Sequence, residues 1–254
     1  MNFSKFNHAY KRDGVIGFIN VLFGKIGIKY RFKTLIYKRI KYLEEQLKKI
    51  SKNFVLTGPY KNLKIVNYVN WSDYDFNSKI LGIYEKEVQQ KLVEWNCKNF
   101  INLGAAEGYH GLGQVITKTK SMLYVFEQDE ISRKILKDNA QMNNLKDKVE
   151  IFGKADKNFL ELLKSKNIDL RETCFLLDIE GDEYNILNDA VIKDLENSKL
   201  IIELHSNQSH QEKLLENLKK YFKIEILTTS KRDLSSFSFL ENFSDIDRWL
   251  LVSE

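Results

Sequence analysis

Apolar residues recur at intervals of three and four positions between Lys33 and Lys52, and lysines fill many of the gaps between them. This spacing matches one face of an α-helix, so the segment is predicted to be an amphipathic helix. A second helix is predicted from about Ser78 to Trp95. Between the two helices, the only proline, in Thr57-Gly58-Pro59-Tyr60, and the polar stretch Asn70-Trp71-Ser72-Asp73 predict turns.

After residue 98 the pattern changes, because short apolar runs alternate with longer amphipathic ones. Such alternation is typical of parallel strands joined by crossover helices. Seven strands are predicted: Phe100–Leu103, Met122–Phe126, Val149–Phe152, Cys174–Asp178, Leu200–Leu204, Ile224–Leu227 and Arg248–Val252. The helical patterns between them lie near Gly111–Thr117, Glu130–Asn143, Lys157–Lys164, Glu183–Leu195 and His210–Phe222.

The predicted fold is therefore α/β, a Rossmann-like, seven-stranded and mostly parallel sheet with helices on both faces. No long helix separates the last two predicted strands, so the final strand is expected to enter antiparallel. A boundary is predicted near residue 97, with a basic helical region at 1–97 and the main domain at 98–254.

Composition narrows the class of protein. No stretch approaches the roughly 20 apolar residues that span a bilayer, and the short run Gly14–Gly24 contains Asn20 and leads into Lys25. We therefore expect no transmembrane segment and no cleaved signal peptide. The two cysteines, Cys97 and Cys174, form no metal-binding pattern and no disulfide framework, which favours a reducing compartment such as the cytoplasm.

The charge is unevenly distributed. Residues 25–64 carry twelve lysines and arginines against only Glu44 and Glu45, and residues 1–24 add +2. Since the whole chain has a net charge of +5, residues 65–254 carry −7. The basic segment 25–64 suits an anionic membrane surface, a nucleic acid or a phosphorylated substrate, or it is simply a solvated helix face.

The chemistry concentrates where the predicted strands end, which is where open α/β sheets bind ligands. The first strand leads into Asn102-Leu103-Gly104-Ala105-Ala106-Glu107-Gly108-Tyr109-His110-Gly111, whose small residues allow a ligand close to the backbone. Glu127 ends the second strand, twenty-three residues after Gly104, where an acidic side chain accepts hydrogen bonds from ribose hydroxyls. Together these features predict a nucleoside site. NAD is disfavoured, because the G-x-G-x-x-G arrangement that admits a pyrophosphate is absent.

Three segments in this order resemble the motifs of class I S-adenosylmethionine-dependent methyltransferases, particularly the FkbM-type group. They are Asn102-Leu103-Gly104-Ala105-Ala106-Glu107-Gly108-Tyr109, Val125-Phe126-Glu127-Gln128-Asp129 and Leu177-Asp178-Ile179-Glu180-Gly181-Asp182-Glu183. The resemblance covers residues 98–252 and implies S-adenosylmethionine as the cofactor.

The resemblance also implies roles for individual residues. Gly104, Ala106 and Gly108 would contact the amino-acid part of the cofactor, Glu127 its ribose and Asp156 its adenine amino group. Asn102 stands where many relatives have an aspartate, so Glu107 is the alternative partner for the cofactor's amino group. Asp156 is also placed to cap the helix predicted to begin near Lys157.

Acidic residues follow the fourth and fifth predicted strands. Asp178 is followed by Glu180 and Asp182, and Glu203 lies two residues before His205. One interpretation is a Mg²⁺ or Mn²⁺ site formed by Asp178, Glu180, Glu203 and His205, which would activate an acceptor hydroxyl. A second has no metal and uses His205 or His110 as the general base. A third is structural, and Asp182 and Glu183 also suit the first turn of a helix.

Two earlier segments, Thr57-Gly58-Pro59-Tyr60-Lys61 and Leu81-Gly82-Ile83-Tyr84-Glu85, resemble segments that precede the core in some bacterial relatives. They imply substrate contacts from Lys61, Tyr84 and Glu85, or only a cover over the sheet edge. The function implied is O-methylation of a sugar, a glycan precursor or a related small molecule, possible with or without a metal. The alternative is an RNA methyltransferase that holds nucleic acid with its basic N-terminal region. A non-enzymatic cofactor-binding scaffold is the least favoured interpretation.

Overall fold

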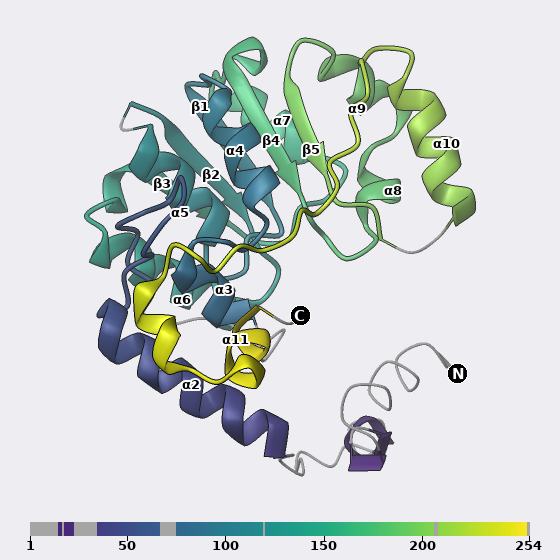
Figure 1. Ribbon diagram of the computed structural model, residues 1–254. Helices are drawn as coiled ribbons and strands as arrows, with labels where there is room; N and C mark the ends of the chain where they lie inside the picture. Colours follow the sequence, from purple (N-terminus) through teal and green to yellow (C-terminus); the bar gives the residue numbers. More distant parts are fainter. Residues whose placement is uncertain are drawn as a thin grey trace. The chain divides into compact units, whose positions relative to one another are not determined.

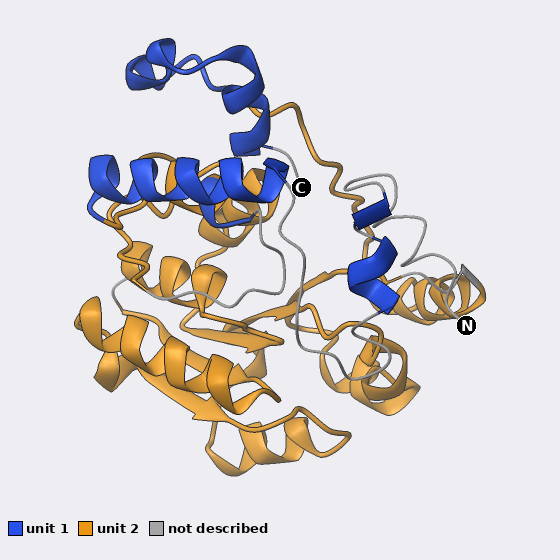
Figure 2. Ribbon diagram, turned by 90° about the horizontal axis from the view of Figure 1, so that it is seen from below, with its two compact units in different colours: residues 1–52, 73–77, 234–254 blue, residues 53–72, 78–233 orange. Residues whose placement is uncertain are grey.

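A computed structural model describes residues 15, 16, 18–22, 35–66, 75–118, 120–205 and 208–252. The chain divides into two compact units (Figure 2). The first comprises residues 1–52, 73–77 and 234–254, and the second comprises residues 53–72 and 78–233. Segments on both sides of position 97 therefore belong to the second unit.

The second unit is organised around one parallel sheet (Figure 1). Its strands are β1 (Asn99–Leu103), β2 (Met122–Phe126), β3 (Val149–Phe152), β4 (Thr173–Leu177) and β5 (Lys199–Ile202), in the order β3-β2-β1-β4-β5. Every adjacent pair is parallel, with Ile101 of β1 opposite Tyr124 and Phe175. This order reverses direction between β1 and β4, so the carboxyl ends of these two strands flank the crevice where such sheets bind ligands.

The helices of this unit connect the strands. They are α4 (Lys86–Glu94), α5 (Tyr109–Thr117), α6 (Glu130–Met142), α7 (Phe159–Ser165), α8 (Glu183–Ile186), α9 (Asp189–Asp194) and α10 (Gln208–Leu218), with 3₁₀ turns at Lys146–Lys148 and Leu170–Glu172. Helix α3 (Asp75–Leu81) spans the division between the two units. From β1 the chain adds β2 and β3 on one side of that strand and then β4 and β5 on its other side. Right-handed crossovers therefore place α5 and α6 on one face of the sheet and α7 to α9 on the other.

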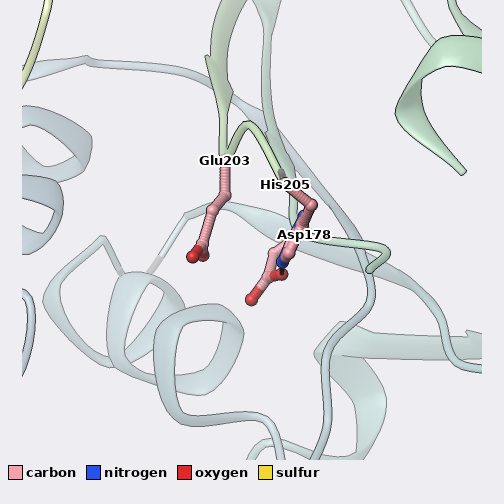
Figure 3. A group of neighbouring side chains, drawn as sticks. All are labelled: Asp178, Glu203 and His205. Carbon is pink, nitrogen blue, oxygen red and sulfur yellow. Dashed lines mark ion pairs between the residues drawn. The ribbon is translucent and has the colours of Figure 1, made fainter. Parts of the chain in front are cut away.

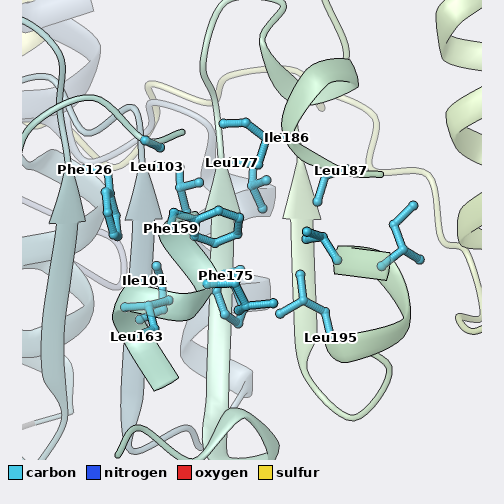
Figure 4. Close-up of a cluster of buried hydrophobic side chains, with 14 of the residues drawn as sticks. Ile101, Leu103, Phe126, Phe159, Leu163, Phe175, Leu177, Ile186, Leu187 and Leu195 are labelled. Carbon is cyan, nitrogen blue, oxygen red and sulfur yellow. The ribbon is translucent and has the colours of Figure 1, made fainter. Parts of the chain in front are cut away.

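Alternate residues of each strand point to opposite faces of the sheet. On the α7 to α9 face, Ile101, Leu103, Phe175 and Leu177 pack in a buried cluster with residues of the covering helices and of the turns that follow them, among them Phe159, Leu163, Ile186, Leu187 and Leu195 (Figure 4). Fully burying one such side chain contributes roughly 1.5–3 kcal/mol. Phe100 and Asn102 of β1 face the other side and are also buried. Burial on both faces explains why these strands read as continuous apolar runs.

Two of the seven predicted strands are wrong, since the described residues contain five. Residues 224–227 form no strand, and the side chain of Ile226 is 81% exposed. Residues 248–252 belong to a helix, α11 (Asp245–Val252), so no antiparallel strand ends the described chain. The positions buried in the structure, Asp247, Leu250 and Leu251, follow helical spacing.

The helix predicted from Ser78 to Trp95 is two helices, α3 and α4. The break is at Gly82, whose φ is 81° and whose added Cβ would lie 2.0 Å from the carbonyl oxygen of Thr57. Only glycine tolerates both the left-handed backbone and this close approach. The predicted helix Glu183–Leu195 is likewise divided, because Asn188 begins α9 by accepting hydrogen bonds from Ala190 and Val191.

In the first unit, the predicted amphipathic helix is α2 (Leu35–Ser51), which packs against α11. Arg39 donates two hydrogen bonds of 2.6 Å to the carboxylate of Asp247. Lys41 and Lys48 both pair with the buried carboxylate of Glu44. Part of the basic charge is therefore neutralised within the unit. Residues 25–34 of the basic segment and the turn predicted at residues 70–73 lie outside the described residues. The unit also contains a 3₁₀ turn at Ser238–Asn242.

Cys97 and Cys174 form a disulfide, with their Cα atoms 5.9 Å apart. The expectation that the two cysteines stay unpaired is therefore wrong. Cys97 precedes β1 and Cys174 lies in β4, and the pairing of Phe100 with Cys174 in the sheet brings them together. Their separation of 77 residues gave no pattern from which the pair could be predicted. Among the described residues, no helix is long and apolar enough to cross a membrane.

Candidate functional site

The loop after β1 lies directly against the end of β4. Gly104 has a φ of +80°, and a Cβ at this position would be 1.7 Å from the carbonyl oxygen of Asp178. The amide of Gly104 donates to Phe126, and the amide of Asp178 donates to Leu103. Position 104 therefore requires glycine, because the protein's own backbone approaches it closely. The two hydrogen bonds hold the ends of β2, β1 and β4 together.

Glu127 binds the same loop from the end of β2. Its two carboxylate oxygens accept hydrogen bonds of 2.8 Å from the amides of Ala106 and Asp129. Ala106 has a φ of 47°, and Gly108, with a φ of 90°, begins α5. Since each carboxylate oxygen has two lone-pair sites, Glu127 keeps acceptor capacity for ribose hydroxyls. The structure therefore brings together the glycine loop and the acidic residue that the sequence singled out.

Two polar residues at the end of β1 and in the loop after it are buried. Asn102 is buried beneath α5, and its amide nitrogen lies 3.5 Å from the carbonyl oxygen of Gly104. Glu107 forms a buried ion pair with Lys79, with 2.7 Å between Oε1 and Nζ. Its second oxygen, Oε2, has no hydrogen-bond partner among the described residues. A buried acceptor without a partner is unusual and fits a ligand that carries a donor such as an ammonium group.

Asp156 lies in the exposed turn before α7. Its side chain accepts a hydrogen bond of 2.8 Å from the amide of Asn158, and its carbonyl oxygen accepts from Phe159. These bonds form the turn that leads into α7, but the N-cap of that helix is Asn158, so Asp156 does not cap it. They leave the second carboxylate oxygen available to a ligand.

Asp178, Glu203 and His205 form an acidic centre at the carboxyl ends of β4 and β5 (Figure 3). One potential ligand atom from each residue lies within 4.8 Å of the others. The amide of Glu203 donates to Leu177, which aligns the two strand ends. His205 Nε2 lies 3.5 Å from Asp178 Oδ1 and 3.8 Å from Glu180 Oε2. The other ring nitrogen, Nδ1, lies 3.1 Å from Glu183 Oε1.

The carboxylates of the acidic centre perturb one another. Burial, together with the charges of Glu203 and Glu85, raises the pKa of Asp178 to about 7. Burial and the charge of Glu85 also raise the pKa of Glu203. Burial disfavours the charged form of His205, but the surrounding carboxylates, Glu183 first, outweigh it and raise its pKa. The centre thus holds more negative charge than its histidine neutralises, a condition that favours uptake of a proton or a cation.

A second histidine, His110, lies in what we call the tyrosine cluster, formed by Tyr60, Tyr84, Tyr109 and His110. The three tyrosine ring centroids lie 5.9, 5.9 and 5.3 Å from that of His110. His110 Nε2 is 2.9 Å from Glu85 Oε2, and Nδ1 is 3.4 Å from the hydroxyl of Tyr60. Burial opposes ionisation of Glu85, but hydrogen bonds from His110 and Tyr84 outweigh it and lower the pKa of Glu85 to about 2.

The structure unites some predicted residues and separates others. Tyr84 and Glu85 both contact His110. The negative charge of Glu85 also contributes to the raised pKa of Asp178 in the acidic centre. Lys61, in contrast, is exposed, and its neighbour Tyr60 is the residue of that segment that is buried. Sequence reasoning missed Tyr60, Lys79 and Glu183. The first two gave no signal, whereas the acidic pair Asp182 and Glu183 was read only as a helix start.

Among known proteins, solved structures of low sequence identity resemble this chain in fold. No family model matches the chain, and no curated protein matches it. An O-methyltransferase from Bacillus cereus, solved in complex with SAH, is 12% identical, with a TM-score of 0.40 over 80% of this chain and 82% of that one. A precorrin-6y C5,15-methyltransferase from Geobacter metallireducens is 13% identical, with a TM-score of 0.42 over 55% and 73% of the two chains. A tRNA methyltransferase from B. subtilis is 15% identical, with a TM-score of 0.37 over 50% and 53%. Similarity at this level does not assign an activity to this chain.

Proposed function

We propose that this protein is an S-adenosylmethionine-dependent O-methyltransferase that acts on a hydroxyl of a sugar, a glycan precursor or a related small molecule. The observation that carries the proposal is the contact at Gly104, which joins a nucleoside-binding loop to the acidic centre. A methyl donor and an acceptor hydroxyl need this proximity, because transfer requires the two reacting atoms about 3–3.5 Å apart. The three motif segments that resemble class I methyltransferases support the same conclusion.

The cofactor half of the site consists of the loop and the two strand ends beside it. Glu127 would accept the ribose hydroxyls, and Asp156, in the turn after β3, would lie beside the adenine. The buried Oε2 of Glu107 is the free acceptor that fits the cofactor's amino group. When bound, S-adenosylmethionine supplies an activated methyl group. The residues named here bind and orient it.

The acceptor half is the acidic centre. In the first alternative, Asp178, Glu203 and His205 would hold a Mg²⁺ or Mn²⁺ ion, which would supply the positive charge that lowers the pKa of an acceptor hydroxyl. Hard oxygen donors and an imidazole form an appropriate ligand set for these ions. Glu180, whose side chain is 83% exposed, is a candidate fourth ligand. The mutual repulsion of the carboxylates, which an ion would relieve, favours this alternative.

In the second alternative a histidine removes the hydroxyl proton without a metal. Between the two candidates, His205 is favoured over His110. Both ring nitrogens of His110 are engaged, one by Glu85 and the other by Tyr60. His205 has a carboxylate partner on Nδ1 and presents Nε2 to the acidic centre. A general base needs one such accessible nitrogen.

Titration calorimetry with S-adenosylmethionine and S-adenosylhomocysteine tests the proposal. Binding in the micromolar range is expected for the unmodified chain, loss of binding for Glu127→Ala, and no change for Glu130→Ala, an exposed glutamate three residues further on. Elemental analysis of the purified protein decides between the metal and the metal-free alternatives. Absence of binding to the unmodified chain, with or without Mn²⁺, would overturn the proposal. Salt-sensitive binding of RNA would instead support the RNA methyltransferase alternative.

A further inference from the structure

Glu183 has an environment that its position at a helix start does not explain. Acidic residues in a first turn are ordinarily solvated and interact with the helix dipole. Glu183 is 0% exposed, and α8 contains only four residues. Its side chain points back toward β4, where Oε1 accepts a hydrogen bond of 2.9 Å from the amide of Ile179. The left-handed φ angles of Glu180 (56°) and Gly181 (103°) make the tight turn that permits this contact.

The same oxygen of Glu183 lies 3.1 Å from Nδ1 of His205. The next residue, Tyr184, donates its hydroxyl to the carbonyl oxygen of His205 at 2.6 Å, and Gln211 donates to that oxygen at 3.0 Å. Consecutive residues of α8 therefore hold the ring and the backbone of one histidine. Burying a carboxylate costs free energy that is not recovered without a partner, so an arrangement of this kind calls for a role.

The chemistry of the contact is directional. A carboxylate accepts hydrogen bonds, so the nitrogen facing Glu183 is the one that carries the proton. In a neutral imidazole the other nitrogen then has a lone pair and no hydrogen. That nitrogen, Nε2, faces Asp178 at 3.5 Å and Glu180 at 3.8 Å. A lone pair aimed at carboxylates is stable only when a cation or a transferable proton lies between them.

We propose that Glu183 is a positioning residue that fixes the orientation and the tautomer of His205, so that Nε2 is the atom presented to the acidic centre. The inference deepens the proposed function, because both alternatives, a metal ligand and a general base, need the same unprotonated Nε2. Carboxylates behind metal-binding histidines commonly act in this way. The tautomer itself depends on neither cofactor nor metal, so it is measurable even if the methyltransferase proposal fails.

Nitrogen-15 NMR of histidine-labelled full-length protein tests the inference, at a pH at which the ring is neutral. The chain has only four histidines, and His205→Asn assigns the signal of position 205. The expected result is a proton on Nδ1 in the unmodified protein. Glu183→Met, which removes the acceptor, should move the population toward the Nε2-protonated form, and Glu183→Gln, which keeps an acceptor oxygen, should retain the original form. Glu180→Gln is the matched control, since it removes a carboxylate facing the opposite nitrogen and should leave the tautomer unchanged.

Titration with Mn²⁺ alone gives a second readout. If the ion binds the unmodified chain, Glu183→Met should weaken its affinity about 10–100-fold, the usual effect of removing such an outer partner. A proton on Nε2 of His205 in the unmodified protein would overturn the proposal, and this result needs no variant at position 183 to fold. An unchanged tautomer in a folded Glu183→Met protein would also overturn it. Failure of S-adenosylmethionine to bind, with the tautomer as expected, would instead count against the proposed function alone.

Discussion

Two histidines of the second unit, His110 and His205, each contact a glutamate, but the other side chains around them differ. His110 meets Glu85 at 2.9 Å, and His205 meets Glu183 at 3.1 Å. The ring of His110 is 12% exposed and surrounded by tyrosines, whereas that of His205 is 24% exposed and faces Asp178 and Glu180. Both nitrogens of His110 are engaged within the protein, while one nitrogen of His205 points into the acidic centre.

This difference shows that a histidine–glutamate pair does not by itself indicate catalysis. In the tyrosine cluster the pair completes a packed interior, and its contribution is expected to be mainly to stability. In the acidic centre the pair leaves charge unmatched, and its contribution is expected to be mainly to ligand binding. Four substitutions test the contrast, and they are given from the largest expected effect to the smallest.

Replacing Tyr60 by alanine should have the largest effect. The ring of Tyr60 is fully buried, and a Cβ added at Gly113 would lie 2.4 Å from it, so the ring packs tightly against α5. We expect the free energy of unfolding to fall by about 3–5 kcal/mol, measured by urea denaturation. Tyr221→Ala, at a more exposed position, should change it far less. A loss below about 1 kcal/mol for Tyr60→Ala would show that the tyrosine cluster is not a packed interior.

Glu85→Gln should reduce stability by about 1–3 kcal/mol at neutral pH, since it removes a charged hydrogen-bond partner of His110. The pKa of Glu85 is lowered from 4.5 to about 2 because the hydrogen bonds from His110 and Tyr84 outweigh burial. Its stabilisation is therefore complete above about pH 4.5 and is lost as the pH falls toward 2. Denaturant unfolding of both proteins across this range should show the difference shrinking in acid. Glu94→Gln, an exposed position in α4, should give no such trend.

Asp178→Asn should have the opposite effect, an increase in stability at high pH. The pKa of Asp178 is raised from 3.8 to about 7 by burial and by Glu203 and Glu85, so the folded state binds more protons than the unfolded state between these values. Wild-type stability therefore falls as the pH rises from about 4 to about 7, and the asparagine variant should be the more stable at pH 8. The side chain is 40% exposed, so solvent screening should keep the gain near 1 kcal/mol.

Thermal melting at pH 5 and pH 8 in the presence of a chelator checks this expectation. Added Mn²⁺ should stabilise the wild type more than the Asp178→Asn variant, because the ion binds the folded protein. A variant that is less stable than the wild type at pH 8 would contradict the view that repulsion dominates the acidic centre.

Glu180→Gln should have the smallest effect on stability, within about 0.5 kcal/mol, because its side chain is 83% exposed. Thermal melting measures this change, and Mn²⁺ titration measures any role as a ligand. A large loss of stability would place Glu180 inside the packed structure and weaken the contrast between the two histidine sites.

The sequence predicted the parallel sheet well, because each strand from β1 to β5 is an apolar run bounded by turn residues. Met122–Phe126 and Val149–Phe152 are confirmed with their predicted bounds. The two failures are in the last thirty residues or so, where short apolar groups were read as strands. Local pattern does not distinguish Arg248–Val252 from a strand, since the deciding contact, between Asp247 and Arg39, joins residues 208 positions apart.

The candidate site was predictable to the extent that it follows strand ends. Asp178, Glu203 and His205 were expected to converge because parallel strands place their carboxyl ends at one edge, and they lie together. The pairing of Glu85 with His110, the burial of Tyr60 and the ion pair between Lys79 and Glu107 were not predictable. Each depends on how the segment 53–97 folds beside α5, for which the sequence offers turn signals and one predicted helix but no indication of which side chains meet.

The carbonyl oxygen of Asp178, which lies where a Cβ of residue 104 would be, limits how this protein can change. A single added methyl group at position 104 would displace the backbone of Asp178, so the proposed donor-binding and acceptor-binding halves cannot be changed independently there. Laboratory selection for a new acceptor should therefore accept substitutions in the segment 53–97 far more readily than at Gly104. Natural variation among related sequences is likewise expected to accumulate in the segment 53–97 rather than at Gly104.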